Sequence, residues 1–170
     1  MNKFTVGIIT VSDKGSRGER TDLSGPAIEE MIGTIGGRVE RYVIVPDEKE
    51  EIKTAIVEMS DALGLNLILT TGGTGFAERD VTPEATMEVI EKHVPGIPEA
   101  MRAKSLLITP KAMLSRAQAG IRKKSLIVNL PGSPKGVREN LEVILPALGH
   151  GIEILTGKAF ECAEPLKHHK

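Results

Sequence analysis

Short apolar runs alternate with amphipathic segments along this chain. Four runs rich in β-branched residues have the length of buried strands, at residues 4–11, 38–45, 65–69 and 125–130. The segments between them repeat apolar residues at helical spacing, most clearly at Ile52, Ile56, Met59 and Leu63. Strands that alternate with helices predict an α/β fold, here a Rossmann-like three-layer α/β/α sandwich with a mostly parallel central sheet.

Polar residues in front of the helical segments predict where the helices begin. The predicted N-caps are Ser24, Asp47, Thr82 and Ser133. Glu50 stands three residues after Asp47, which is the spacing of a capping box. Residues 112–120 fit neither the helical nor the strand pattern clearly. No linker or repeat divides the chain, so we expect a single domain over residues 1–158 and a C-terminal tail over residues 159–170.

Composition narrows the class of protein. The chain has 170 residues, of which 40% are hydrophobic and 26% charged, a soluble globular profile. A net charge of −1 gives no reason to expect a nucleic-acid or membrane partner, and one tyrosine and three phenylalanines are too few to stack single-stranded bases. The single cysteine, Cys162, cannot form an internal disulfide, and the apolar run 4–11 is too short to span a membrane. These features predict a cytoplasmic protein.

Ligands of parallel α/β sheets bind beyond the carboxyl ends of the strands. Four loops leave predicted strands at that edge, over residues 12–23, 46–47, 70–81 and 131–133. We therefore expect these loops to share one pocket.

The loop Thr70–Gly75 has the sequence TTGGTG. Glycine lets the backbone turn tightly and approach a ligand, and successive amides can then bind an anion. Its candidate phosphate-binding residues are Thr71, Gly72, Gly73, Thr74 and Gly75. The loop is neither a P-loop nor a dinucleotide fingerprint, because it lacks the lysine of the first and the G-x-G-x-x-G spacing of the second. A flexible turn with no ligand remains the alternative.

Two aspartates stand beside this loop in the predicted arrangement. A carboxylate near a phosphate site is unfavourable unless a cation lies between them, so one interpretation of Asp80 is that it binds Mg²⁺ and the other is that it pairs with Arg79 in a surface loop. Arg79 could clamp a phosphate, or it could form a surface ion pair with a neighbouring aspartate. Asp47 ends a strand at the same edge, although an N-cap role alone would explain it.

Further candidates lie at other strand ends and in the second half of the chain. Ser12 and Asp13 follow the first strand and could hold a ligand or form an Asx turn. The turn after the last strand could bind an anion or simply be rigid; its candidates are Asn129, Pro131, Gly132 and Ser133. Ser115 and Arg116 belong to a locally basic stretch, which is either a solvated face or a phosphate patch.

Several motifs occur together in one order: TVSD, VPDE, TTGGTG, RDVTPEA, PGIPEAMR, MLSRAQAG and NLPGSPKG. As an ordered set they resemble the molybdenum-cofactor biosynthesis proteins of the MogA/MoaB type, which are related to the G domain of gephyrin. The resemblance covers nearly the whole chain. The segment after residue 155 carries no matching motif.

The resemblance implies a Mg²⁺-dependent molybdopterin adenylyltransferase. Such an enzyme transfers AMP from ATP to the phosphate of molybdopterin and releases pyrophosphate. By matching position, Asp47 and Asp80 are the implied catalytic and metal-binding residues, and Ser115 is the implied pterin-binding residue. A homotrimer is implied, with a hexamer as the other assembly, and other molybdenum-cofactor enzymes as partners. The alternative is a MoaB-like protein that binds molybdopterin as a scaffold without catalysis.

Overall fold

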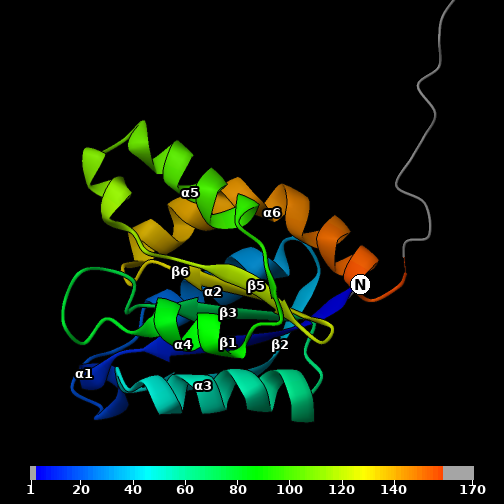
Figure 1. The fold of residues 1–170 in the computed structure, drawn as a ribbon, viewed down its shortest axis with the longest axis horizontal. Helices are drawn as coiled ribbons and strands as arrows, with labels where there is room; N and C mark the ends of the chain where they lie inside the picture. Colours follow the sequence, from blue (N-terminus) through cyan, green and yellow to red (C-terminus); the bar gives the residue numbers. More distant parts are fainter. Residues whose placement is uncertain (1–2, 159–170) are drawn as a thin grey trace, which may run out of the picture.

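A six-stranded sheet runs through the centre of the computed structural model, which describes residues 3–158 (Figure 1). Its strands are β1 (Phe4–Val11), β2 (Gly37–Val45), β3 (Leu67–Thr71), β4 (Lys92–His93), β5 (Ala119–Arg122) and β6 (Ser125–Leu130). The order across the sheet is β2-β1-β3-β6-β5-β4. The first four strands in that order pair in parallel, and β5 and β4 pair antiparallel to their neighbours. The prediction of a mostly parallel sheet is confirmed.

Helices cover both faces of the sheet. They are α1 (Asp13–Ser16), α2 (Ser24–Gly33), α3 (Lys49–Val57), α4 (Thr82–Val89), α5 (Gly96–Leu106) and α6 (Pro134–Leu155). A π-helical turn η1 (Glu58–Ala62) extends α3, and a 3₁₀ turn η2 (Pro110–Leu114) follows α5. Residues of α2, α5 and α6 pack on one face, and residues of α3 and α4 pack on the other (Figure 1). This is the predicted three-layer sandwich.

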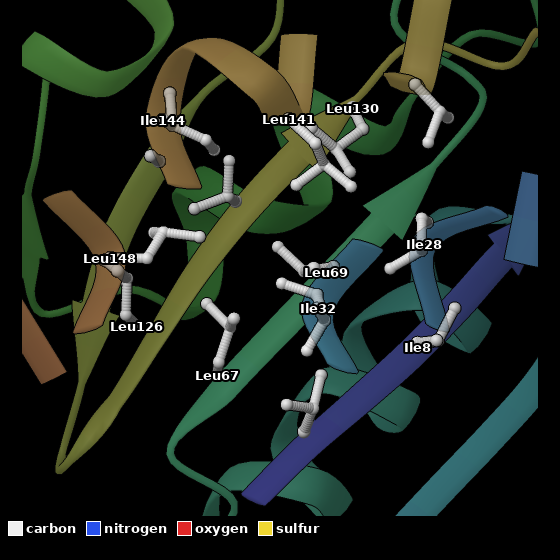
Figure 2. Packing of buried hydrophobic residues seen from close by; sticks show 14 of the residues in the cluster. Ile8, Ile28, Ile32, Leu67, Leu69, Leu126, Leu130, Leu141, Ile144 and Leu148 are labelled. Atoms are coloured by element: carbon white, nitrogen blue, oxygen red, sulfur yellow. The ribbon is translucent and has the colours of Figure 1, made fainter. Parts of the chain in front are cut away.

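The strand residues alternate between the two cores, as the pleat requires. Leu67 and Leu69 of β3 lie in the larger core with α2 and α6 (Figure 2), while Ile68 between them faces α3 and α4. In β6, Ile127 likewise faces away from its neighbours. Strands that are buried on both faces appear in the sequence as continuous apolar runs, which is why the hydrophobic pattern alone predicted them.

The connections that follow the adjacent strands β1 and β3 diverge to opposite faces of the sheet. The chain leaves β1 through α2 on one face of the sheet, and it leaves β3 through α4 on the opposite face. Adjacent strands whose following helices diverge form a switch point, where a crevice opens beyond their carboxyl ends. The topology therefore predicts a ligand site next to Ser12 and Gly72.

Three predicted helix caps are wrong in detail. The hydroxyl of Ser24 donates to Gly132 O (2.8 Å), and Asp22 Oδ1 accepts from the amide of Ser24 (2.9 Å). Helix α3 begins after Glu48 rather than after Asp47, with no side-chain cap, and Thr82 caps nothing. Ser133 is confirmed as a cap, since its Oγ accepts from Gly136 N at 3.0 Å.

The other differences concern short elements. Strand β3 starts two residues later than predicted and includes Thr70 and Thr71. The ambiguous residues 112–120 contain the end of η2 and the start of β5. Neither β5 nor the two-residue β4 was predicted. The predicted tail at 159–170 lies outside the described residues, and the single domain over 1–158 stays a prediction.

Candidate active site

A cavity of about 600 Å³ opens at the carboxyl ends of β1 and β3. All four loops that were predicted to share a pocket contribute to its lining. The predicted site residues on its wall are Ser12, Asp47, Thr71, Gly72, Gly73, Gly132 and Ser133. Its volume is typical of a small-molecule site.

The glycines of the TTGGTG loop are required by close packing. Gly72 and Gly73 have φ angles of +100° and +68°, which L side chains rarely adopt. A Cβ on Gly72 would collide with Val11 O, and a Cβ on Gly73 would collide with Thr82 Oγ1. The backbone therefore lines the cavity directly.

Part of the loop's hydrogen-bonding capacity is used within the protein. The amide of Gly72 donates to Leu130 O (3.2 Å), and Thr71 Oγ1 donates to Pro131 O (2.6 Å). The amides of Gly73, Thr74 and Gly75 have no acceptor among the described residues. These amides are donors that the loop could offer to an anion.

Asp13 and Asp47 fasten the ends of β1 and β2 to each other. The amide of Asp13 donates to Asp47 Oδ2 (2.9 Å), and the amide of Asp47 donates to Asp13 Oδ1 (3.0 Å). Burial raises the pKa of Asp47, and the negative charges of Asp13 and Asp80 raise it further, against the lowering effects of the Asp13 amide and Arg79. Asp47 Oδ1 accepts no hydrogen bond from the described residues, so one oxygen remains for a ligand.

Arg79 binds carboxylates rather than an open site. Its guanidinium donates to Asp13 Oδ2 (2.6 Å) and Oδ1 (2.9 Å) and to Glu48 Oε1 (2.8 Å). The hydrogen bonds from Arg79 lower the pKa of Asp13 to about 2. The surface-pair interpretation of Arg79 describes this geometry, with Asp13 as its partner.

Asp80 shapes the loop beyond the glycines. Its Oδ2 accepts from the amide of Ala77 (2.9 Å), and its own amide donates to Ala77 O (2.9 Å). The influence of its charge on the pKa of Asp47 places both carboxylates in one electrostatic environment. Asp80 does not line the main cavity itself.

The described residues contain no group of three or more His, Cys, Asp or Glu side chains that could hold a metal. Mg²⁺ keeps several waters and substrate phosphates and needs only one or two protein carboxylates. The residues present fit such an ion in two respects. Asp47 Oδ1 accepts no hydrogen bond from the described residues, and a cation would offset the burial that chiefly raises the pKa of Asp47 as well as the added repulsion from Asp13 and Asp80.

Ser115 and Arg116 lie in a second cavity of about 420 Å³, together with Arg102. Arg116 joins this cavity to the glycine loop. Its guanidinium donates to Gly75 O (2.7 Å) and Asp80 O (2.7 Å), and its amide donates to Thr74 O (2.9 Å). The structure therefore places some of the predicted site residues on the main cavity and Ser115 and Arg116 on the second one. The predicted residues that line neither cavity are Asp13, Thr74, Gly75, Asp80, Asn129 and Pro131.

Asn129 is completely buried and has internal partners for its whole amide group. Its Nδ2 donates to Thr70 Oγ1 (3.0 Å) and Thr86 Oγ1 (2.8 Å), and its Oδ1 accepts from Gln118 N (3.1 Å). Such a residue positions β3, α4 and β6 beneath the site. Ser12 is likewise occupied, because its Oγ accepts from Gly15 N (2.9 Å) as the N-cap of α1.

The sequence pattern did not point to several residues at the main cavity. Arg20, Thr21, Asp22 and Ser24 all line it. Asp22 could have been found from its place two residues before a predicted helix, where carboxylates bind free amides. Thr82 Oγ1 is the one buried side-chain polar atom without a hydrogen-bond partner in residues 3–158. It lies beside Gly73, as does Asp47 Oδ1.

Comparison with known proteins identifies the family of this chain. The family model for the probable molybdopterin binding domain matches residues 7–150. Molybdopterin adenylyltransferase from Helicobacter pylori strain J99 is 43% identical over 166 residues, covering 96% of this chain and 94% of that protein. The protein of the same name from Escherichia coli K12 is 43% identical over 159 residues, with 89% and 81% covered.

Solved structures extend the comparison to the fold. The molybdopterin biosynthesis enzyme MoaB from Thermus thermophilus matches with a TM-score of 0.87 and 52% identity, covering 93% of this chain and 99% of that one. The resemblance inferred from the ordered motifs is thereby confirmed: this chain belongs to the MogA/MoaB family of molybdenum-cofactor biosynthesis proteins, which carry the molybdopterin-binding domain.

Proposed function

We propose that this chain is a molybdopterin adenylyltransferase, which transfers AMP from ATP to the phosphate of molybdopterin. Its nearly full-length relatives of that name support the activity. The single structural observation that carries the proposal is the meeting of the glycine loop with Asp47 at one cavity. Amides with no acceptor and a carboxylate with a raised pKa suit a polyanion accompanied by a cation.

In the proposed reaction, an oxygen of the pterin phosphate attacks the α-phosphorus of ATP. A bond forms between that oxygen and the phosphorus, while the bond to the bridging oxygen of the β-phosphate breaks and pyrophosphate leaves. Both substrates are anions, so the protein's task is to hold them close together and to balance their charge. The amides of Gly73 and Thr74 would bind phosphate oxygens.

Asp47 and Asp80 would hold Mg²⁺, which supplies neutralisation of phosphate charge when it is bound. Asp13 positions Asp47 through the reciprocal amide contacts and so directs Oδ1 toward the cavity. Asp80 orders the loop that follows Gly75. Neither aspartate needs to exchange a proton, because a phosphate oxygen is already an anionic nucleophile.

The second cavity is the proposed pterin side of the site. Ser115 would contact the pterin, and Arg116 fixes the wall between the two cavities through Gly75 O and Asp80 O. The two cavities thus suit two substrates on either side of one loop.

The competing function is a MoaB-like protein that binds molybdopterin as a scaffold without catalysis. The decisive experiment incubates the purified protein with molybdopterin, ATP and Mg²⁺ and measures pyrophosphate. Pterin-dependent pyrophosphate that disappears in Asp80→Asn, while pterin binding persists, supports the enzyme. Pterin binding without pyrophosphate under several divalent metals would support the scaffold.

A homotrimer is the proposed assembly. Large apolar side chains are exposed where α5 ends and η2 projects from the body of the molecule (Figure 1), namely Leu106, Leu107, Ile108, Met113 and Leu114. A patch of this kind marks a protein interface. Light scattering should give three times the chain mass, and a monomer would contradict the proposal.

The cytoplasm is the proposed location, since ATP is available there, and the enzyme that inserts molybdate is the proposed recipient of the product. In the described chain, no helix is both long and apolar enough to cross a membrane.

A further inference from the structure

Arg20 differs from every other arginine in the described residues. Eight of the nine arginines bind a carboxylate or a backbone carbonyl through the guanidinium, as Arg17 binds Glu19 and Arg122 binds Asp61. The guanidinium of Arg20 has no such partner within residues 3–158. It is also the only lysine or arginine side chain on the wall of the main cavity, as far as the described chain extends.

The loop that carries Arg20 is anchored on both sides. Gly18 turns the chain before it, with a φ angle of +73°. After it, Asp22 accepts hydrogen bonds from Thr10 Oγ1 (2.6 Å), Ser24 N (2.9 Å) and Tyr42. The backbone at residue 20 is therefore held at the mouth of the cavity, and the freedom that remains lies in the arginine side chain.

The charge of the cavity favours an anionic ligand at this position only if positive charge is present, and Arg20 supplies it from the protein. Its other ionisable lining residues are Asp22 and Asp47, which both carry negative charge when ionised. Asp22 is occupied by the hydrogen bonds just described, and Asp47 already lies near Asp13 and Asp80. A triphosphate would meet net repulsion from these carboxylates unless positive charge faced it.

We propose that Arg20 binds the β- and γ-phosphates of the nucleotide and so holds the pyrophosphate that leaves. Gly72 is buried at the floor of the cavity, while Arg20 is exposed at its mouth. The α-phosphate would lie over the glycine loop, and the outer phosphates would extend toward the guanidinium. Guanidinium matches the geometry of phosphate oxygens and can bind two of them at once. The assignment rests on the proposed use of ATP at this site.

The test compares Arg20→Gln with Arg17→Gln by titration calorimetry, using ATP, inorganic pyrophosphate and AMP as probes. Arg17 is the matched control, because it is an exposed arginine three residues away that does not line the cavity. Arg20→Gln should weaken the affinity for ATP and for pyrophosphate about tenfold or more, which is the loss expected for a charge-assisted hydrogen bond. Its affinity for AMP should be unchanged. Arg17→Gln should bind all three probes like the wild type, and Arg20→Lys should recover part of the affinity.

Equal affinity of Arg20→Gln and Arg17→Gln for ATP and pyrophosphate would overturn the assignment. So would an equal loss of AMP, because that would place Arg20 at the nucleoside or the α-phosphate. The proposed activity is judged separately by wild-type turnover. A wild type that binds pyrophosphate through Arg20 yet adenylylates no pterin would reject the transferase and leave the phosphate site standing.

Discussion

The side chains of Asp13 and Asp47 each accept a hydrogen bond from the other's backbone amide, with N···O distances of 3.0 Å to Asp13 Oδ1 and 2.9 Å to Asp47 Oδ2. This exchange ties the carboxyl ends of β1 and β2 together, and it leaves Asp47 Oδ1 free beside the glycine loop. Asp47 is thus fixed in position by a partner 34 residues away in the sequence, rather than by its own helix. The relationship explains how a partly buried carboxylate is kept at the cavity.

Replacing Asp47 with asparagine should separate activity from stability. Removal of the charge should lower turnover at least about 100-fold, the size of effect seen when one preorganised electrostatic group is lost. The folded state raises the pKa of Asp47, so its ionised form opposes folding above that pKa. Asp47→Asn should therefore melt at the same temperature as the wild type or higher at neutral pH, as measured by calorimetry.

Asp61→Asn is the control for that variant. Asp61 pairs with Arg122 and Lys123 and is no part of either cavity. It should lose thermal stability and keep its turnover. A turnover loss in Asp61→Asn similar to that in Asp47→Asn would show that the assay reports general unfolding.

The ion pair of Arg79 with Asp13 should make the free energy of unfolding depend on pH in the acid range. The folded state lowers the pKa of Asp13 from 3.8 to about 2. A group whose pKa is lowered by folding stabilises the folded state at pH values above its pKa in the unfolded chain. This contribution is lost as the pH falls through its pKa in the folded protein. Arg79→Gln should therefore be less stable than the wild type at about pH 5, with the difference shrinking toward about pH 2. A difference that does not change with pH would contradict the ion pair.

Gly73→Ala tests the close approach of the backbone. A side chain at a φ angle of +68° costs about 1–2 kcal/mol, and the new Cβ would also collide with Thr82 Oγ1. We expect lower unfolding free energy and the loss of nucleotide affinity. Gly33→Ala is the matched control, because nothing lies within 4 Å of its added Cβ at the end of α2. It should be as stable as the wild type or up to about 1 kcal/mol more stable.

Thr82 and Thr86 form a matched pair on α4, since both are fully buried. Thr82 Oγ1 has no partner in the described chain, so Thr82→Val should cost no stability. Thr86 Oγ1 accepts from Asn129 Nδ2 (2.8 Å) and donates to Thr82 O (2.9 Å). Thr86→Val should cost about 1–3 kcal/mol, because it leaves one N–H of the Asn129 side-chain amide unsatisfied. Chemical denaturation measures both, and equal losses would contradict the assignment of the unpartnered hydroxyl.

The strands and the shared pocket could be predicted because both depend on local pattern and on parallel topology. The run 125–130 is β6 as predicted, and the loops at Ser12, Asp47 and Gly72 meet at one cavity. The caps could not be predicted in the same way. Ser24 has the right residue type and neighbours for an N-cap, but its hydroxyl binds Gly132 O, 108 residues away.

Asp47 illustrates the same limit. Its spacing from Glu50 predicted a capping box, yet its carboxylate binds the amide of Asp13 from another strand end. Long-range partners of this kind leave no local signature. Strands β4 and β5 were missed for a different reason, because two and four residues are too few to display a period.

The central claim is the transfer of AMP to molybdopterin, and ATP labelled at the α-phosphate tests it most directly. The wild-type protein with Mg²⁺ and molybdopterin should move the label onto the pterin and release unlabelled pyrophosphate in equal amount. Asp47→Asn should transfer almost none, while Asp61→Asn should transfer as much as the wild type. Label that stays in ATP, with molybdopterin bound and pyrophosphate absent, would contradict the account.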